Sequence, residues 1–252
     1  KYKTTWVRTD STVDTANNRA TVTIKTTTDL TYTDTTVKLG SKYQYAVRAV
    51  NGDVKSSYVG SEALKYNVVP TVKIANTATG VKVSWSTAAN ATGYTVYRSE
   101  YNAKTKKWSG WTNRGTTKST TSSWTDKKVT SGVQYKYTVR ACYNSIKSSY
   151  TDTKGLLYLA QPTVTVKAVS NGINVAWSQC EGATGYTVYR SEYNTKTKKW
   201  SSWKSMGTAK ADKSNWTDKK ATKGVTYKYT VRAVNADTGS KSTYVASKSV
   251  KR

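Results

Sequence analysis

The chain repeats itself at a fixed interval of 92 residues, and this repeat limits the folds open to it. The segment 91–111 (ATGYTVYRSEYNAKTKKWSGW) returns almost unchanged at 183–203 (ATGYTVYRSEYNTKTKKWSSW). Run backwards, the same offset finds a weaker third copy, in which Tyr43 and Arg48 match Tyr135 and Arg140. A unit that recurs at this spacing is one folding module. The repeat therefore predicts three modules: residues 1–68, 69–160 and 161–252.

Module one is shorter than the other two. A step of 92 residues back from Trp85 ends before residue 1, so the leading strands of module two have no counterpart there. A sandwich without those strands leaves sheet edges open. We therefore expect upstream residues in a longer parent protein, and a closed seven-stranded module within 1–68 would contradict this. Strand exchange between chains is the alternative, although no strand-like segment is left over to donate.

Each full module shows seven short strand signals separated by turn signals. Thr, Ser, Val and Tyr dominate, and such residues suit a pleated, half-buried surface. In module two the signals fall at 71–75, 80–85, 93–101, 108–116, 122–126, 133–141 and 148–157. This spacing predicts an all-β chain of tandem seven-stranded, antiparallel Greek-key β-sandwiches. The brief proline-bearing links at 67–70 and 159–162 predict a beads-on-a-rod arrangement.

Several anchor residues resemble those of fibronectin type III modules, particularly those attached to extracellular enzymes and surface proteins of Gram-positive Firmicutes. Trp85 and Trp177 match the buried Trp of the second strand, and Tyr137 and Val139 match the alternation of the penultimate strand. Tyr135 resembles the tyrosine corner, whose hydroxyl bonds to upstream backbone. The resemblance implies immunoglobulin-like sandwiches that serve as spacers, adhesion modules or glycan-associated accessory modules. It also implies a secreted or cell-surface location, associated with the cell wall.

The sequence lacks the usual machinery of an enzyme. The chain has no His, which removes the commonest general base and metal ligand. Asp34, Asp126 and Asp218 recur at one module position, where we expect a turn cap. Glu100 and Glu192 lack the second carboxylate of a glycosidase pair. We therefore predict a non-catalytic protein with no catalytic residues, no metal and no cofactor.

Two tryptophan-bearing hairpins are the main candidates for function. KTKKWSGW (104–111) and KTKKWSSW (196–203) each carry two Trp and a Lys cluster. Flat aromatic rings stack on sugars, so a Trp pair is a candidate glycan platform. Trp108 and Trp111 are three residues apart, however, and a regular strand sends them to opposite faces. A bulge at Gly110 would realign them, but Ser202 takes that place in module three.

Strand parity gives a second argument about these hairpins. It places Trp108 on the same side of its strand as Arg114, and Trp200 on the same side as Met206, a residue type that commonly packs in a core. We therefore expect at least one Trp of each pair to be structural. Parity also defines an outer sheet face, where Tyr97 and Arg140 would form a cation–π pair or part of a binding surface. The candidate ligand-binding residues are Tyr97, Tyr101, Trp108, Trp111, Arg140, Tyr189, Tyr193, Trp200, Trp203 and Arg232.

The chain is strongly basic, with 41 Lys and Arg against 14 Asp and Glu, a net charge of +27. Module one holds 10 basic and 6 acidic residues, module two 14 and 3, and module three 17 and 5. Such a field attracts polyanions, namely anionic cell-wall polymers, acidic glycans or nucleic acid. Lysines that guard strand edges are the alternative explanation. Nucleic acid ranks last because no recognition helix or motif supports it.

Two functional hypotheses remain from the sequence. The first is a spacer or adhesion segment of a larger bacterial surface or secreted protein, with other domains of that parent as partners. The second is a set of carbohydrate-binding accessory modules of a polysaccharide-degrading enzyme or scaffold. No apolar run approaches the length of about 18 residues that membrane insertion by a helix needs.

Overall fold

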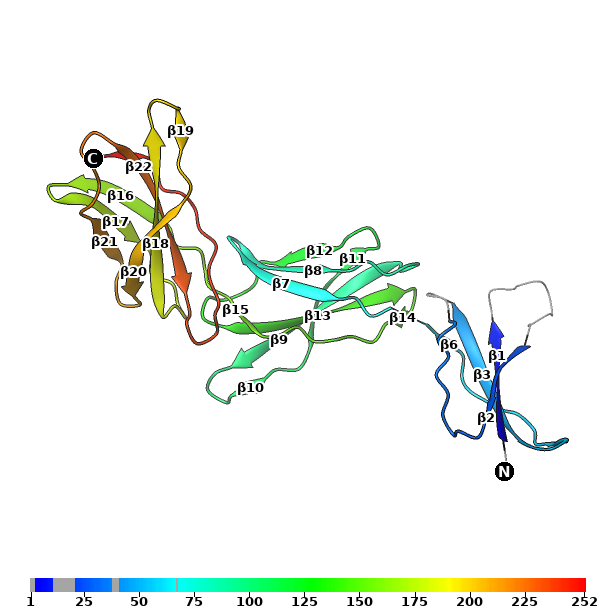
Figure 1. Cartoon of the computed structure of the whole chain (residues 1–252). Coiled ribbons are helices and arrows are strands. Elements are labelled where there is room, and N and C mark those ends of the chain that lie inside the picture. Colours follow the sequence, from blue (N-terminus) through cyan, green and yellow to red (C-terminus); the bar gives the residue numbers. More distant parts are fainter. Residues whose placement is uncertain (1–2, 11–20, 38–40, 67) are drawn as a thin grey trace.

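The computed structural model describes residues 3–10, 21–37, 41–66 and 68–252. Three β units follow one another along the chain, with the termini in the two outermost units (Figure 1). Within the described residues every regular element is a strand. None of these residues forms a helix that could cross a membrane. The predicted all-β class is therefore confirmed.

Module two is a sandwich of two antiparallel sheets. The smaller sheet has the order β12-β8-β7, and β9 lies at the centre of the other, between β13 on one side and β10 and β11 on the other. β10 and β11 both pair with β9, and β14 and β15 pair with opposite ends of β13, so the module has the predicted seven strands when each of these two pairs is counted as one. The strands are β7 (Val72–Thr77), β8 (Gly80–Trp85), β9 (Gly93–Asn102), β10 (Lys107–Trp108), β11 (Thr112–Lys118), β12 (Ser123–Asp126), β13 (Gln134–Tyr143), β14 (Ile146–Lys147) and β15 (Leu156–Leu157).

Module three copies this arrangement, with one sheet in the order β16-β17-β21 and the other built around β18 and β22. The same residue pairs meet in both modules: β9 and β13 pair Val96 with Val139, and β18 and β22 pair Val188 with Val231. The strands are β16 (Val164–Val169), β17 (Gly172–Trp177), β18 (Gly185–Asn194), β19 (Lys199–Trp200), β20 (Lys204–Lys210), β21 (Asn215–Asp218), β22 (Thr226–Val234) and β23 (Val250–Lys251).

Module one contains a single sheet among its described residues. Its central strand β3 pairs with β1, β4, β5 and β6, and β1 also pairs with β2. The described part of 1–68 forms no second layer opposite this sheet. The strands are β1 (Lys3–Asp10), β2 (Thr21–Thr27), β3 (Lys42–Asn51), β4 (Val54–Lys55), β5 (Val59–Gly60) and β6 (Leu64–Lys65).

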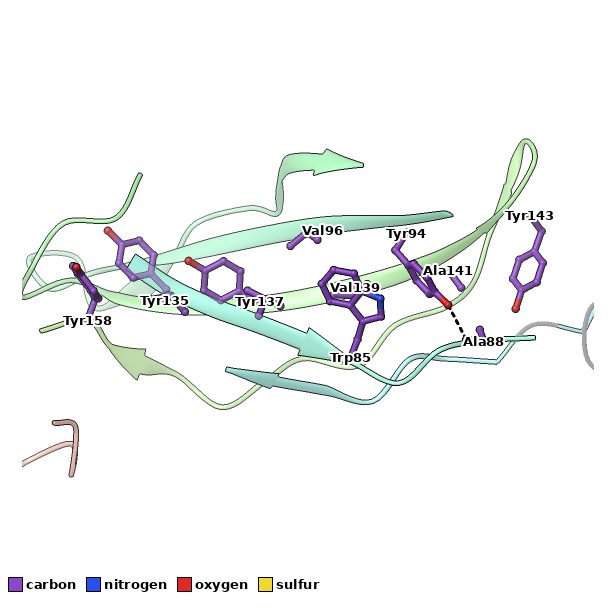
Figure 2. Packing of buried hydrophobic residues seen from close by; sticks show 12 residues of the cluster. Trp85, Ala88, Tyr94, Val96, Tyr135, Tyr137, Val139, Ala141, Tyr143 and Tyr158 are labelled. Atoms are coloured by element: carbon purple, nitrogen blue, oxygen red, sulfur yellow. Dashed lines mark hydrogen bonds between the residues drawn. The ribbon is translucent and has the colours of Figure 1, made fainter. Parts of the chain in front are cut away.

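Aromatic and β-branched side chains fill the space between the two sheets of module two (Figure 2). Trp85 is 5% exposed, and its ring centroid lies 5.5 Å from that of Tyr94. The Tyr135 hydroxyl accepts a hydrogen bond of 2.8 Å from the Thr130 amide, and Tyr227 is engaged in the same way by Thr222. The predicted buried Trp and tyrosine corner are thus confirmed.

Modules two and three share a short linker whose side chains belong to both cores. Tyr158 packs in the core of module two, whereas Leu157 and Leu159 pack in the core of module three. The Ser131 hydroxyl donates a hydrogen bond of 2.7 Å to the Glu181 carbonyl across the joint and accepts one of 3.1 Å from the Ala160 amide. Because neighbouring linker residues are buried in different cores, the linker restricts how the two modules are oriented.

Candidate ligand-binding faces

The candidate residues lie on the outer surface of the larger sheet in modules two and three. Along β9 and β13, Tyr94, Val96 and Tyr137 face inward and are at most 1% exposed. Their neighbours Tyr97 and Arg140 therefore point outward, because side chains alternate along a strand. They are only partly buried. The predicted outward orientation of Tyr97 and Arg140 is confirmed, although Thr138 on the same face is only 1% exposed.

Trp108 and Trp111 both reach this outer face, so the prediction that they point to opposite sides was wrong. Trp108 pairs with Tyr101 and Thr112 pairs with Arg98, so the returning strand holds one residue more than β9 between these pairs. Such a bulge shifts the alternation by one position. The parity grouping of Trp108 with Arg114 fails for the same reason.

A serine hydroxyl, rather than a glycine, supports this bulge. The Ser109 hydroxyl accepts a hydrogen bond of 3.0 Å from the Glu100 amide and donates one of 3.0 Å to the Gly110 carbonyl. In module three Ser201 makes the same two bonds, to Glu192 and to Ser202, at 3.0 and 3.1 Å. The bulge therefore forms in both modules, although only module two has a glycine there.

The first part of each face is a tyrosine–tryptophan–lysine cluster. The centroids of Tyr101 and Trp108 are 5.2 Å apart at 53°, and the Lys136 ammonium lies 4.5 Å from the Trp108 centroid. In module three Tyr193 and Trp200 repeat the 5.2 Å and 53°, and Lys228 repeats the 4.5 Å. Trp200 is 37% exposed, so its ring is accessible from solvent.

The second part of each face combines Trp111 or Trp203 with a tyrosine of the last strand and an arginine. Trp111 meets Tyr150 edge-on at 6.0 Å, and Trp203 meets Tyr244 at 6.4 Å. Tyr150 and Tyr244 are 44% and 45% exposed. The hollow of about 150 Å³ in module two is lined by Tyr97, Trp111, Thr138, Arg140 and Tyr150.

Arg140 in this second part is held by a backbone carbonyl and by the ring of Tyr150, whereas the ring of Tyr97 was expected. The Arg140 guanidinium lies over Tyr150, 5.7 Å from its centroid, and its Nε donates a hydrogen bond of 2.6 Å to the Ser148 carbonyl. Arg232 and Tyr244 repeat this stack at 5.5 Å. The cation beside Tyr97 is Lys147, which donates a bond of 2.9 Å to the phenol oxygen. The expected pair of Tyr97 with Arg140 is corrected accordingly.

We call each set the aromatic face of its module. The aromatic face of module two comprises Tyr97, Tyr101, Trp108, Trp111, Lys136, Arg140 and Tyr150; that of module three comprises Tyr189, Tyr193, Trp200, Trp203, Lys228, Arg232 and Tyr244. Sequence reasoning missed Tyr150 and Tyr244 as candidates. Their signal was the motif KSSY at 147–150, which recurs as KSTY at 241–244.

The recurrent aspartates cap turns. Asp126 accepts a hydrogen bond of 2.9 Å from the Lys128 amide, which is the predicted turn cap. It is also 1% exposed and binds Arg98 at 2.8 Å and the Tyr137 hydroxyl at 3.1 Å. Burial and then the negative charge of Asp126 raise the pKa of Tyr137 far above its usual value.

The recurrent glutamates are also engaged within the structure. The Glu100 carboxylate forms an ion pair with Arg98, and Glu192 lies 3.9 Å from Arg190. Burial lowers the pKa of Arg98, but Asp126 and Glu100 outweigh it, so the net shift is upward. Each arginine thus bridges a buried aspartate and a partly exposed glutamate. Among the described residues no cluster of acids and cysteines could hold a metal ion.

Comparisons with known proteins relate parts of the chain to other proteins. No protein-family model matches it. Exoglucanase B of Cellulomonas fimi is 30% identical over 199 residues, which are 70% of this chain and 16% of that protein. The chain thus spans about a sixth of the length of this relative.

Among solved structures, a two-module fibronectin type III segment of chicken tenascin is 16% identical, with a TM-score of 0.39, over 73% of this chain and 99% of its own. The FN1–FN3 domains of chicken CNTN1 are 12% identical, with a TM-score of 0.31, over 99% and 87%. The chicken interferon gamma receptor alpha chain is 12% identical, with a TM-score of 0.40, over 72% and 97%. The strand order of modules two and three establishes the fold independently of these scores.

Proposed function

We propose that the chain is a non-catalytic accessory segment of an extracellular polysaccharide-degrading enzyme or scaffold. In this proposal modules two and three each bind an anionic polysaccharide through their aromatic faces. The observation that carries the proposal is the recurrence of the same surface geometry, to within 0.5 Å in the ring and cation distances, in two modules. The similarity to exoglucanase B supports the polysaccharide context.

The chemistry of the faces favours an acidic chain over a neutral one. Partly exposed tyrosine and tryptophan rings offer apolar surface to sugar rings, and Lys136 and Arg140 lie over the rings of Trp108 and Tyr150, where their charges can meet acidic groups of the same chain. The hollow of about 150 Å³ is smaller than a usual ligand pocket, so it suits a charged substituent better than a whole sugar. Arg140 in its lining attracts carboxylates, and that attraction weakens as salt screens it.

Affinity electrophoresis tests this proposal in gels that contain polygalacturonate, starch, xylan or cellulose derivatives. We expect retardation in polygalacturonate, and its loss in the double variant Trp111→Ala, Trp203→Ala. Truncating a central aromatic group at a binding surface typically costs about 2 kcal/mol or more, close to 30-fold in affinity. Unchanged retardation in that variant would end the proposal.

A matched pair of variants separates the faces from general charge. Lys136→Gln with Lys228→Gln removes two charges on the faces, whereas Lys127→Gln with Lys219→Gln removes two from exposed turns elsewhere. We expect the first pair to weaken binding more than the second. Equal losses would mean that the net charge of the protein attracts polyanions without a defined site.

A spacer role is the second candidate, and the joint between modules two and three favours it. Leu157 and Leu159 are 5% and 0% exposed in the core of module three, although they precede its first strand. A linker anchored in this way holds neighbouring domains at a fixed distance. Small-angle scattering tests this: one fixed separation of the two modules supports a spacer, and a broad distribution contradicts it.

A further inference from the structure

Module two has a charged cleft that is separate from its aromatic face. The cleft is formed by β11 of the larger sheet and by β12 of the smaller sheet with the turn that follows it, and its volume is about 520 Å³. This volume is in the usual range of ligand sites. Three side chains of the lining are cationic and one is anionic, so the cleft attracts anions. The lining includes Asn113, Arg114, Trp124, Asp126, Lys127 and Lys128.

Arg114 is the cation of this cleft whose hydrogen-bonding capacity is least used. Its Nε is buried and lies 3.6 Å from the Asp126 carboxylate, which is beyond hydrogen-bond distance. This Nε makes no hydrogen bond with any residue that the structure describes. A buried donor without an acceptor is costly, and such groups normally meet one. The guanidinium carries five N–H donors, and the side chain is 19% exposed, so it can still donate to a ligand in the cleft.

Module three shows that the buried aspartate does not need this second arginine. Met206 stands at the position of Arg114. Asp218 nevertheless binds Arg190 at 2.8 Å and accepts a hydrogen bond of 2.9 Å from the Tyr229 hydroxyl. It is 1% exposed, as Asp126 is. Arg114 is therefore additional to the network that holds the aspartate, which favours a role in binding.

The balance of charges around the cleft favours a divalent anion. Arg98 and the three cations of the lining face two carboxylates, those of Asp126 and Glu100. Two positive charges are thus left unbalanced. Guanidinium groups bind the oxygens of phosphate through paired, charge-assisted hydrogen bonds, and lysine ammonium groups add charge to such sites.

We propose that the cleft of module two binds a phosphate or sulfate group, with Arg114 as its main donor. Lys127 and Lys128 are exposed residues of the lining and strengthen the attraction. Module three lacks the arginine, so it binds the same group more weakly. The proposal does not depend on polysaccharide binding, because the aromatic faces lie on the outer surface of the larger sheet whereas Arg114 points toward the buried Asp126.

The test is a titration of the full chain with sodium phosphate at constant ionic strength, followed by the indole N–H resonances. Trp124 lines the cleft, and Trp216 is its counterpart in module three. We expect a saturable shift of Trp124 and a much weaker response of Trp216. Arg114→Met copies module three and should weaken binding about tenfold or more, as expected for the loss of a hydrogen bond to a charged group.

Met206→Arg provides the reciprocal test and keeps the experiment decisive if Arg114→Met fails to fold. We expect it to give Trp216 a saturable shift like that of Trp124 in the parent chain. Separate titrations with glycerol phosphate and sodium sulfate distinguish the sources of the group. Tighter binding of glycerol phosphate would assign the cleft to a phosphate ester, and tighter binding of inorganic phosphate or sulfate would assign it to a free anion.

Three results would overturn the proposal. They are no saturable shift of Trp124, a shift that Arg114→Met leaves unchanged, and binding of sodium acetate as tight as that of phosphate. Polygalacturonate carries only carboxylates, so failure of this test would leave the proposal for the aromatic faces intact.

Discussion

Gly182→Ala tests the joint between modules two and three, because a side chain at this position would clash with the backbone of module two. A Cβ atom there would stand 2.4 Å from the Gly132 Cα and 3.1 Å from its nitrogen. Unbonded carbons prefer about 3.5–4.0 Å, so the two modules must move apart by roughly 1 Å. The φ of +84° adds a left-handed penalty of about 1–2 kcal/mol for any residue with a Cβ.

Gly224→Ala is the matched control for this substitution. Gly224 has φ +83°, but an added Cβ meets nothing within 4 Å, so only the backbone penalty applies. Movement at Gly182 also strains the hydrogen bond between Ser131 and Glu181, worth about 0.5–1.5 kcal/mol. We expect a total loss of about 2–4 kcal/mol for Gly182→Ala and about 1–2 kcal/mol for Gly224→Ala.

The assay combines thermal unfolding with small-angle scattering of the full chain. Gly182→Ala should change both the stability and the separation of modules two and three, whereas Gly224→Ala should change stability alone. Equal losses of stability and identical scattering for the two variants would refute the close contact at the joint.

Three further substitutions test the cores. Arg98→Met removes the nearer of the two arginines that face the buried Asp126 carboxylate and leaves only Arg114, 3.6 Å away, so it should cost less than the roughly 3–5 kcal/mol of a fully unpaired buried charge in the denaturant unfolding of module two; a loss below about 1 kcal/mol would contradict the burial. Leu159→Ala should lower the free energy of unfolding of module three by about 2–5 kcal/mol, together with its melting temperature. A loss of stability confined to module two would contradict the burial of Leu159 in the core of module three. Because the pKa of Tyr137 is raised, the unfolded chain releases this proton above about pH 10 while the folded chain keeps it, so the free energy of unfolding should fall by about 1.4 kcal/mol per pH unit. Burial also raises the pKa of Tyr143 and of Tyr158, so Tyr137→Phe should reduce the slope of module two without abolishing it, as measured by denaturant titrations between pH 9 and pH 11.

The architecture of modules two and three could be predicted from the sequence because the repeat shows each position of the module twice. Trp85 and Tyr135 alone are weak signals, but their return at 92 residues fixes which side chains face the core. The joint was not accessible, since Leu157 and Leu159 read as ordinary residues of a last strand and linker. Only the fold shows that they enter the core of the following module.

The location of the aromatic faces followed from the sequence, but their detailed geometry did not. Parity along β9 and β13 correctly placed Tyr97 and Arg140 outside. It failed in the hairpin because the bulge at Ser109 adds one residue to the returning strand. The Ser109 hydroxyl accepts a hydrogen bond from the Glu100 amide, and nothing in the sequence distinguishes such a serine from any other. Tyr150 escaped notice because its strand is held partly by side-chain hydrogen bonds, such as that from the Ala141 amide to the Ser148 hydroxyl, and lacks a clear alternating pattern.

The indole N–H resonances offer the most direct measurement of polysaccharide binding, because the chain places its tryptophans both inside the cores and on the aromatic faces. Titration with oligogalacturonate should shift the signals of Trp108, Trp111, Trp200 and Trp203 and leave those of the buried Trp85 and Trp177 in place. The shifts should shrink as salt rises. No shift at the face tryptophans, or equal shifts at Trp85 and Trp177, would contradict binding at these surfaces.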